Sequence, residues 1–159
     1  MKLARILFWN ILLLASCGRY NKTNSNAVLN ENRVTNELAQ EQIKAFEYTA
    51  ALRGNYQKTT ISKEAILTSK KRGGNPVKQP CTLEDWAKLM DLLELIELEQ
   101  LHKFEPPSKD FQFDGASLAR LRIISKDKIY ETQGFDHGNP PKEVTDLVKE
   151  ILSISENIE

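Results

Sequence analysis

Cysteine and histidine are scarce in this 159-residue sequence: the chain has two of each, Cys17 and Cys81, and His102 and His137. Two thiols cannot build a disulfide framework, and the spacing of these four residues matches no zinc-binding motif. The sequence also lacks a glycine-rich phosphate loop and a serine nucleophile elbow. We therefore expect no metal ion, no cofactor and no enzymatic activity.

An excess of charge of one sign is lacking too, because 22 basic residues balance 22 acidic ones. Residues 1–16 contain the bases Lys2 and Arg5 and no acid, so the chain without them has 20 basic and 22 acidic residues, a net charge of −2. A protein that binds nucleic acid needs a basic face to contact the phosphates. We therefore expect no nucleic-acid partner.

Long apolar runs are absent except near the start of the sequence, where residues 6–14 are mostly apolar and follow Lys2 and Arg5. This run is shorter than the roughly 20 helical residues that cross a bilayer core. A positive start, a short apolar stretch and small residues after it are typical of a secretory signal peptide. We predict that residues 1–16 are such a signal peptide.

The residues that end this stretch, Leu14-Ala15-Ser16-Cys17, resemble the lipobox of bacterial lipoproteins. The resemblance implies cleavage before Cys17, diacylglycerol on its thiol and acylation of the new amino group. The alternative is an ordinary secretory leader that ends at a cysteine by chance. One acyl chain binds a membrane only marginally, so durable anchoring requires several. With Cys17 acylated, Cys81 has no disulfide partner, and we expect a half-buried structural thiol there.

The residues after Cys17 bear on the location of the anchor. They contain no acidic export signal of the kind that lipoproteins of the Bacteroidota carry, and Gly18 is not the aspartate that resembles an inner-membrane retention signal. The resemblance therefore implies a lipid-anchored protein of the cell envelope, in the outer membrane and facing the periplasm.

The composition divides the remaining chain into a tether and a domain. Residues 17–44 are predicted to be a lipidated flexible tether, because Asn, Glu, Gln and Thr dominate them and large apolar side chains are few. A fraying helix is expected around residues 31–42. Residues 45–159 carry regular apolar patterns and are predicted to form one small globular domain.

Within that domain, the apolar pattern switches between two periods. Strands are predicted over residues 46–52, 56–61, 116–125 and 129–132, with residues 65–69 as an optional short one. Residues 46–52 alternate, whereas residues 116–125 are apolar on both faces, which indicates a central strand. Spacings of three and four predict one helix from Thr82 to the prolines at 106–107 and a second one after Pro141. The order ββ(β)αββα predicts an α+β fold, with an antiparallel sheet of four to five strands and two helices packed on one face.

The candidate binding residues are Asp136 and His137, because a carboxylate beside an imidazole can bind a metal ion or move protons. Adjacent residues rarely point at one atom, however. In the structural alternative, Asp136 accepts backbone amides of its loop or of the following helix start, and Gly138 supplies an unusual backbone angle. Asp110 and Asp114, in another predicted loop, could approach the same region.

A second feature is the predicted loop over residues 70–76, which contains Lys70, Lys71 and Arg72. These cations could touch the anionic headgroups of a membrane near the anchor. The alternative is an ordinary solvated loop.

Two resemblances extend beyond the leader. Residues 46–54, 86–107 and 135–141 resemble uncharacterised lipoproteins of the Bacteroidota, which implies no activity. The order of the elements is loosely similar to that of emfourin, a small protein inhibitor of metallopeptidases, although this chain has Arg53-Gly54-Asn55 where that family has paired glycines. We predict a non-enzymatic, periplasm-facing module that binds an unknown protein or envelope component; the alternatives are a peptidase inhibitor and an enzyme that uses Asp136 and His137.

Overall fold

The computed structural model describes residues 42–156; the predicted signal peptide, Cys17 and most of the predicted tether lie outside this range. The described chain forms one seven-stranded sheet and two α-helices. The strands are β1 (Ile43–Leu52), β2 (Asn55–Ser62), β3 (Ala65–Ser69), β4 (Val77–Pro80), β5 (Leu118–Ser125), β6 (Ile129–Glu131) and β7 (Phe135–Asp136). The α-helices are α2 (Leu83–Glu94) and α3 (Thr145–Glu156), and the 3-10 helices are η1 (Leu98–Lys103), η2 (Asp110–Phe113) and η3 (Lys142–Val144).

The predicted α+β class with an antiparallel sheet is confirmed, but the prediction of four to five strands is wrong, because the sheet has seven. The two strands that the sequence pattern does not reveal are β4 and β7. β4 has four residues, none of them buried, and ends in Pro80, while β7 has two residues. Strands this short carry no readable alternation.

The first predicted helix is too long. α2 begins as expected after Thr82, whose hydroxyl accepts a hydrogen bond from the Asp85 amide at 3.0 Å. The helix ends at Glu94, and the chain then forms the 3-10 helix η1. Because η1 still buries Leu98 and Leu101, the apolar spacing continues beyond the end of α2 and imitates a longer helix.

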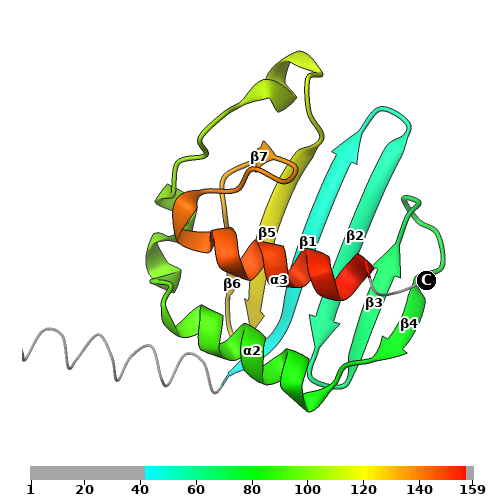
Figure 1. Ribbon diagram of the computed structural model, residues 1–159, viewed down its shortest axis with the longest axis vertical. Coiled ribbons are helices and arrows are strands. Elements are labelled where there is room, and N and C mark those ends of the chain that lie inside the picture. The colour runs from blue at the N-terminus through cyan, green and yellow to red at the C-terminus, as the bar shows by residue number, and fades with distance from the viewer. Residues whose placement is uncertain (1–41, 157–159) are drawn as a thin grey trace, which may run out of the picture.

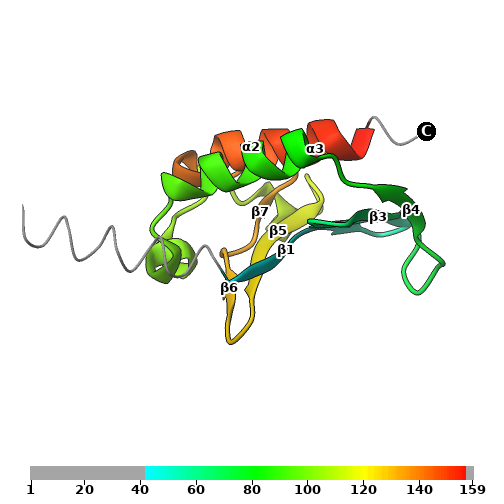
Figure 2. The ribbon, with the colours of Figure 1, turned by 90° about the horizontal axis from the view of Figure 1, so that it is seen from below.

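Strand β1 lies in the middle of the sheet, whose strand order is β4-β3-β2-β1-β5-β6, with β7 beside β5. Both α-helices cover the same face of this sheet (Figures 1 and 2). Alternation puts Phe46 and Tyr48 of β1 on the covered face, opposite Ile123 and Leu121 of β5. All four side chains are fully buried. The core therefore lies between the sheet and the helices.

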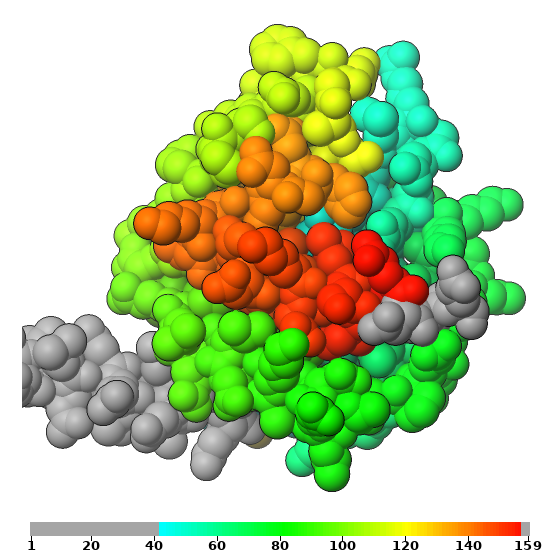
Figure 3. Space-filling model, viewed as in Figure 1, coloured from blue at the N-terminus to red at the C-terminus, as the bar shows by residue number. Residues whose placement is uncertain are grey.

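The two helices lie next to each other (Figure 3), and α3 crosses the middle of the sheet while α2 crosses its lower end in the view of Figure 1. Residues at spacings of three and four turn one apolar side of each helix toward the strands. The buried residues of this layer are Leu89 and Leu93 of α2 and Leu147, Val148, Ile151 and Ile154 of α3.

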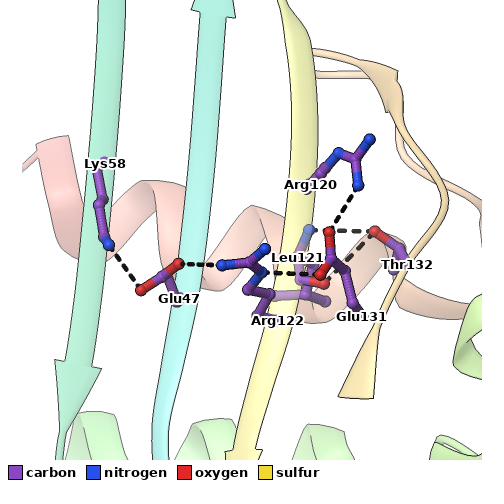
Figure 4. A network of polar contacts seen from close by, with 7 residues as sticks. All are labelled: Glu47, Lys58, Arg120, Leu121, Arg122, Glu131 and Thr132. Carbon is purple, nitrogen blue, oxygen red and sulfur yellow. Dashed lines mark hydrogen bonds and ion pairs between the residues drawn. The ribbon is translucent and has the colours of Figure 1, made fainter. Parts of the chain in front are cut away.

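The opposite face of the sheet carries no helix in the part of the chain that is described, and charged side chains run across its centre (Figure 4). Glu47 on β1 pairs with Lys58 on β2 at 2.8 Å and with Arg122 on β5 at 3.5 Å. Glu131 on β6 pairs with Arg122 at 2.9 Å and with Arg120 at 2.7 Å. Burial alone would raise the pKa of Glu131, but the two guanidinium groups hold it below its usual value. This alternation of charge across four strands lets the open face remain in water.

Leu89 and Leu95 offer a matched pair of substitutions, because Leu89 in α2 is 0% exposed and Leu95 at its C-terminal cap is 84% exposed. We predict that Leu89→Ala lowers the free energy of unfolding by about 2–5 kcal/mol, since it leaves a cavity in the packed layer. Leu95→Ala should change the free energy by less than about 0.5 kcal/mol. Urea denaturation measures both values, and equal losses would contradict this placement of the core.

Candidate functional site

The predicted pair Asp136 and His137 lies where β7 ends. Asp136 belongs to β7 and His137 follows it in a tight turn, which the Asn139 amide closes by donating to the Asp136 carbonyl at 2.8 Å. Gly138 in this turn has a φ of 84°, a value that favours glycine. The two side chains have different partners: Asp136 bonds to residues 108–111, and His137 bonds to Tyr48. The structure therefore does not bring Asp136 and His137 to one shared ligand position.

The Asp136 carboxylate is the centre of a small polar cluster. Its Oδ1 accepts the Phe111 amide at 2.7 Å, and its Oδ2 accepts the Asp110 amide at 3.0 Å and the hydroxyl of Ser108. Ser108 Oγ in turn accepts a hydrogen bond from Asn139 Nδ2 at 2.7 Å. Asp136 does accept backbone amides, then, but those of a segment 25 and 26 residues earlier rather than of its own loop or of a following helix.

These contacts keep Asp136 ionised. With 4% of its surface exposed, burial alone would raise the pKa of the carboxyl. The Ser108 hydroxyl and the amides of Phe111 and Asp110 outweigh this effect and lower the pKa below its ordinary value. A carboxylate that is already bonded to three donors has little capacity left to bind a metal ion or to accept a proton from a substrate.

The segment held by Asp136 is a turn with an exposed aromatic tip. Helix η2 begins at Asp110 and is followed by Asp114 with a φ of 57°, and the Gly115 amide closes the turn on the Asp110 carbonyl at 3.0 Å. Phe113 at the end of η2 is 84% exposed. The position of Asp114 in the left-handed region is uncommon for a residue other than glycine and gives the turn a defined shape. We call residues 109–115 the Phe113 loop.

The base of the Phe113 loop packs through Phe111, which is half-buried, and Gly134 leaves room for this packing. A Cβ atom at position 134 would lie 2.5 Å from Leu118 Cδ1 and 3.6 Å from the ring of Phe111. A side chain there would clash with Leu118, while its contact with Phe111 would be an ordinary van der Waals contact. Gly134 therefore allows the segment that leads into β7 to pack closely against β5 and against the Phe113 loop.

His137 caps the end of a buried tyrosine. Its Nδ1 lies 2.7 Å from the hydroxyl of Tyr48, whose side chain is fully buried in the core, while His137 itself is exposed. Burial raises the pKa of Tyr48 far above its ordinary value, and the amide of Gly138 offsets only part of this rise. Tyr48 therefore stays protonated near neutral pH, and the Tyr48–His137 contact satisfies a polar group at the edge of the core.

Other candidate groups do not join this cluster. Within residues 42–156, no three His, Cys, Asp or Glu side chains stand close enough together to hold a metal ion. Cys81 is partly buried, and burial, followed by the charges of Asp85 and Glu64, raises the pKa of its thiol. His102 is exposed in η1, a different element.

The sequence pattern alone did not identify the partners of Asp136. Of Asp110 and Asp114, which could both approach this region, Asp110 reaches Asp136 through its backbone amide. The apolar pattern does not point to Ser108 or Asn139. The one sequence feature that points to Ser108 is the pair of prolines at 106–107 before it. Proline restricts the backbone, so these two residues hold the start of the following segment in one conformation.

No protein-family model matches the sequence, and comparisons with curated proteins and with solved structures likewise give no match. Among the helices of residues 42–156, none has the length and apolar character needed to cross a membrane. A functional proposal therefore rests on the chain's own residues.

We predict that the amide proton of Phe111 reports the titration of Asp136, because its hydrogen bond weakens when the carboxylate gains a proton. The lowered pKa means that this contribution to stability is present above about pH 4 and is lost as the pH falls through the folded-state value. In an NMR titration the midpoint should lie below 3.8, the ordinary value of the carboxyl. Asp136→Asn should abolish the transition, and a midpoint at or above 3.8 would contradict the role assigned to the carboxylate.

Proposed function

We propose that the chain is a lipoprotein of the bacterial cell envelope, held at a membrane by acylated Cys17, and that its domain is a non-enzymatic binding module. The anchor is supported by Leu14-Ala15-Ser16-Cys17 at the end of a short apolar run with a basic start. In this proposal the domain faces the periplasm from the outer membrane. The 24 residues from 18 to 41 separate anchor and domain, and a flexible chain of that length spans about 25–30 Å.

The observation that carries the binding role is the exposure of Phe113 on a preorganised loop. An exposed Phe side chain does nothing for the stability of the domain, whereas burying it on a partner gains about 1.5–3 kcal/mol. The hydrogen bonds to Asp136 order the loop before binding, which reduces the entropy lost in the complex. Aromatic side chains on ordered loops are frequent anchors of protein interfaces.

Peptidase inhibition, implied by the resemblance to emfourin, is the second candidate function. The same loop favours it, because protein inhibitors of peptidases bind largely in the conformation they already have. An assay of the purified protein against a panel of envelope peptidases separates the two functions. Slowed hydrolysis supports inhibition, and unchanged hydrolysis across the panel removes it.

For the anchor, Cys17 and Cys81 provide a matched pair of substitutions, since they are the two cysteines of the chain. We predict that the wild-type protein and Cys81→Ser, expressed in bacteria with their own leader, enter the detergent phase in a Triton X-114 separation. Cys17→Ser should move to the aqueous phase, because it cannot accept diacylglycerol. Retention of Cys17→Ser in the detergent phase would contradict the lipid anchor.

For the binding loop, Phe113 and Leu95 are suitable sites for a photo-crosslinking amino acid, because both are 84% exposed. We predict that benzoylphenylalanine at position 113 yields a discrete adduct in living cells, whereas the same group at position 95 does not. Adding Asp136→Asn to the first variant should weaken the adduct, since the loop loses its hydrogen bonds. Equal crosslinking at both positions would argue against a specific role of the loop.

A further inference from the structure

The charges of the domain are segregated, although their sum is close to zero. Residues 42–156 contain 17 basic and 18 acidic side chains. Residues 53–78 carry seven basic side chains and one acidic one, whereas residues 82–114 carry three basic and nine acidic ones. The basic segment comprises β2, β3, β4 and their connections, and the acidic segment comprises α2, η1 and η2. One end of the sheet therefore has a positive field that the net charge conceals.

The basic segment contains a hollow on the open face of the sheet. Thr60 and Leu67 form part of its floor and are aligned with Glu47, which places them on the face opposite the helices. The loop of residues 70–76 forms one wall and projects from the sheet on the side away from the helices (Figure 2). The hollow measures about 360 Å³ and is lined by Tyr56, Lys58, Thr60, Leu67, Ser69, Lys71, Gly73, Gly74 and Pro76. That volume accommodates a phosphate group together with part of the molecule that carries it.

The wall of this hollow is ordered by its own hydrogen bonds. The carbonyl of Lys71 accepts the Ser69 hydroxyl at 2.8 Å and the Gly74 amide at 3.1 Å. Gly73 has a φ of 72°, which completes the turn. The guanidinium of Arg72 lies 5.5 Å from the centre of the Tyr56 ring, a cation–π contact. These contacts give the wall a defined shape.

The cations of this wall are not neutralised by the surrounding protein. Lys58 pairs with Glu47 at 2.8 Å, but Lys70, Lys71 and Arg72 have no carboxylate within 4.0 Å among residues 42–156. Three like charges on adjacent residues repel one another, and an anion bound beside them relieves the repulsion. Arginine in particular presents paired N–H donors that match phosphate oxygens.

We propose that this hollow binds a phosphate-bearing anion, with Lys71 of its lining as the principal contact. Arg72 lies outside the lining but over the ring of the lining residue Tyr56, and it is the second cation beside the site. Free phosphate and the headgroup of an anionic phospholipid present the same chemistry. The site does not depend on acylation of Cys17, so an experiment that disproves the lipid anchor leaves this proposal unaffected.

The test is an NMR titration of the processed, isotope-labelled protein in a zwitterionic detergent. Inorganic phosphate and short-chain phosphatidylglycerol are added separately, with chloride at equal ionic strength and short-chain phosphatidylcholine as controls. The amide signals of Gly73 and Gly74 should shift with at least one anion and with neither control. A response to phosphate identifies a soluble anion, and a response to phosphatidylglycerol alone identifies a lipid headgroup; both support the site.

Charge-removing variants make the test specific. Each charge removed should weaken binding about fivefold, so Lys71→Gln combined with Arg72→Gln should weaken it on the order of 25-fold. Lys103→Gln, in the acidic segment, should bind like the wild type. Unmoved glycine signals, or equal binding by the double variant and the Lys103 control, would overturn the proposal. The signals of β1 show in the same spectra that each variant is folded.

Discussion

Strand β1 determines how the rest of the domain is arranged, because it pairs with β2 along one side and with β5 along the other. Its alternating residues separate the two faces of the sheet. Phe46 and Tyr48 point into the layer that α2 and α3 cover, while Glu47 between them joins the ion pairs of the open face. A sheet covered on one face leaves the other available, and the basic hollow beside β2 and β3 is on that available face.

At the end of the sheet, the Asp136 carboxylate determines how the neighbouring loop is arranged. β7 is only two residues long, yet it carries an acceptor that fixes a loop far away in the sequence. The Phe113 loop owes its shape to these bonds and to the left-handed Asp114, not to an apolar core of its own. An exposed aromatic side chain on such a loop and a cationic hollow on the open face give the domain two chemically different surfaces for contacts.

The sequence predicts those parts of the fold that repeat a local pattern. The apolar pattern identifies β1, β2, β3, β5 and β6, and Thr82 marks the start of α2. β4 and β7 are not predicted, because strands of four and two residues are too short to show an alternating pattern. The end of α2 is not predicted either, because η1 continues the apolar spacing of the helix. At the candidate site, the tendency of Asp136 to accept amides follows from its residue type, but the identity of those amides depends on tertiary packing. The exposure of Phe113 depends on it as well.

Cys17 matters most for the proposed function, because acylation there would keep the Phe113 loop and the basic hollow within reach of a membrane surface. The most direct measurement is mass spectrometry of the N-terminal peptide from protein isolated from bacterial membranes. The account predicts a peptide that starts at Cys17 and carries diacylglycerol on the sulfur and an acyl group on the amine. An unmodified residue 17, or a mature chain that starts at another position, would contradict it.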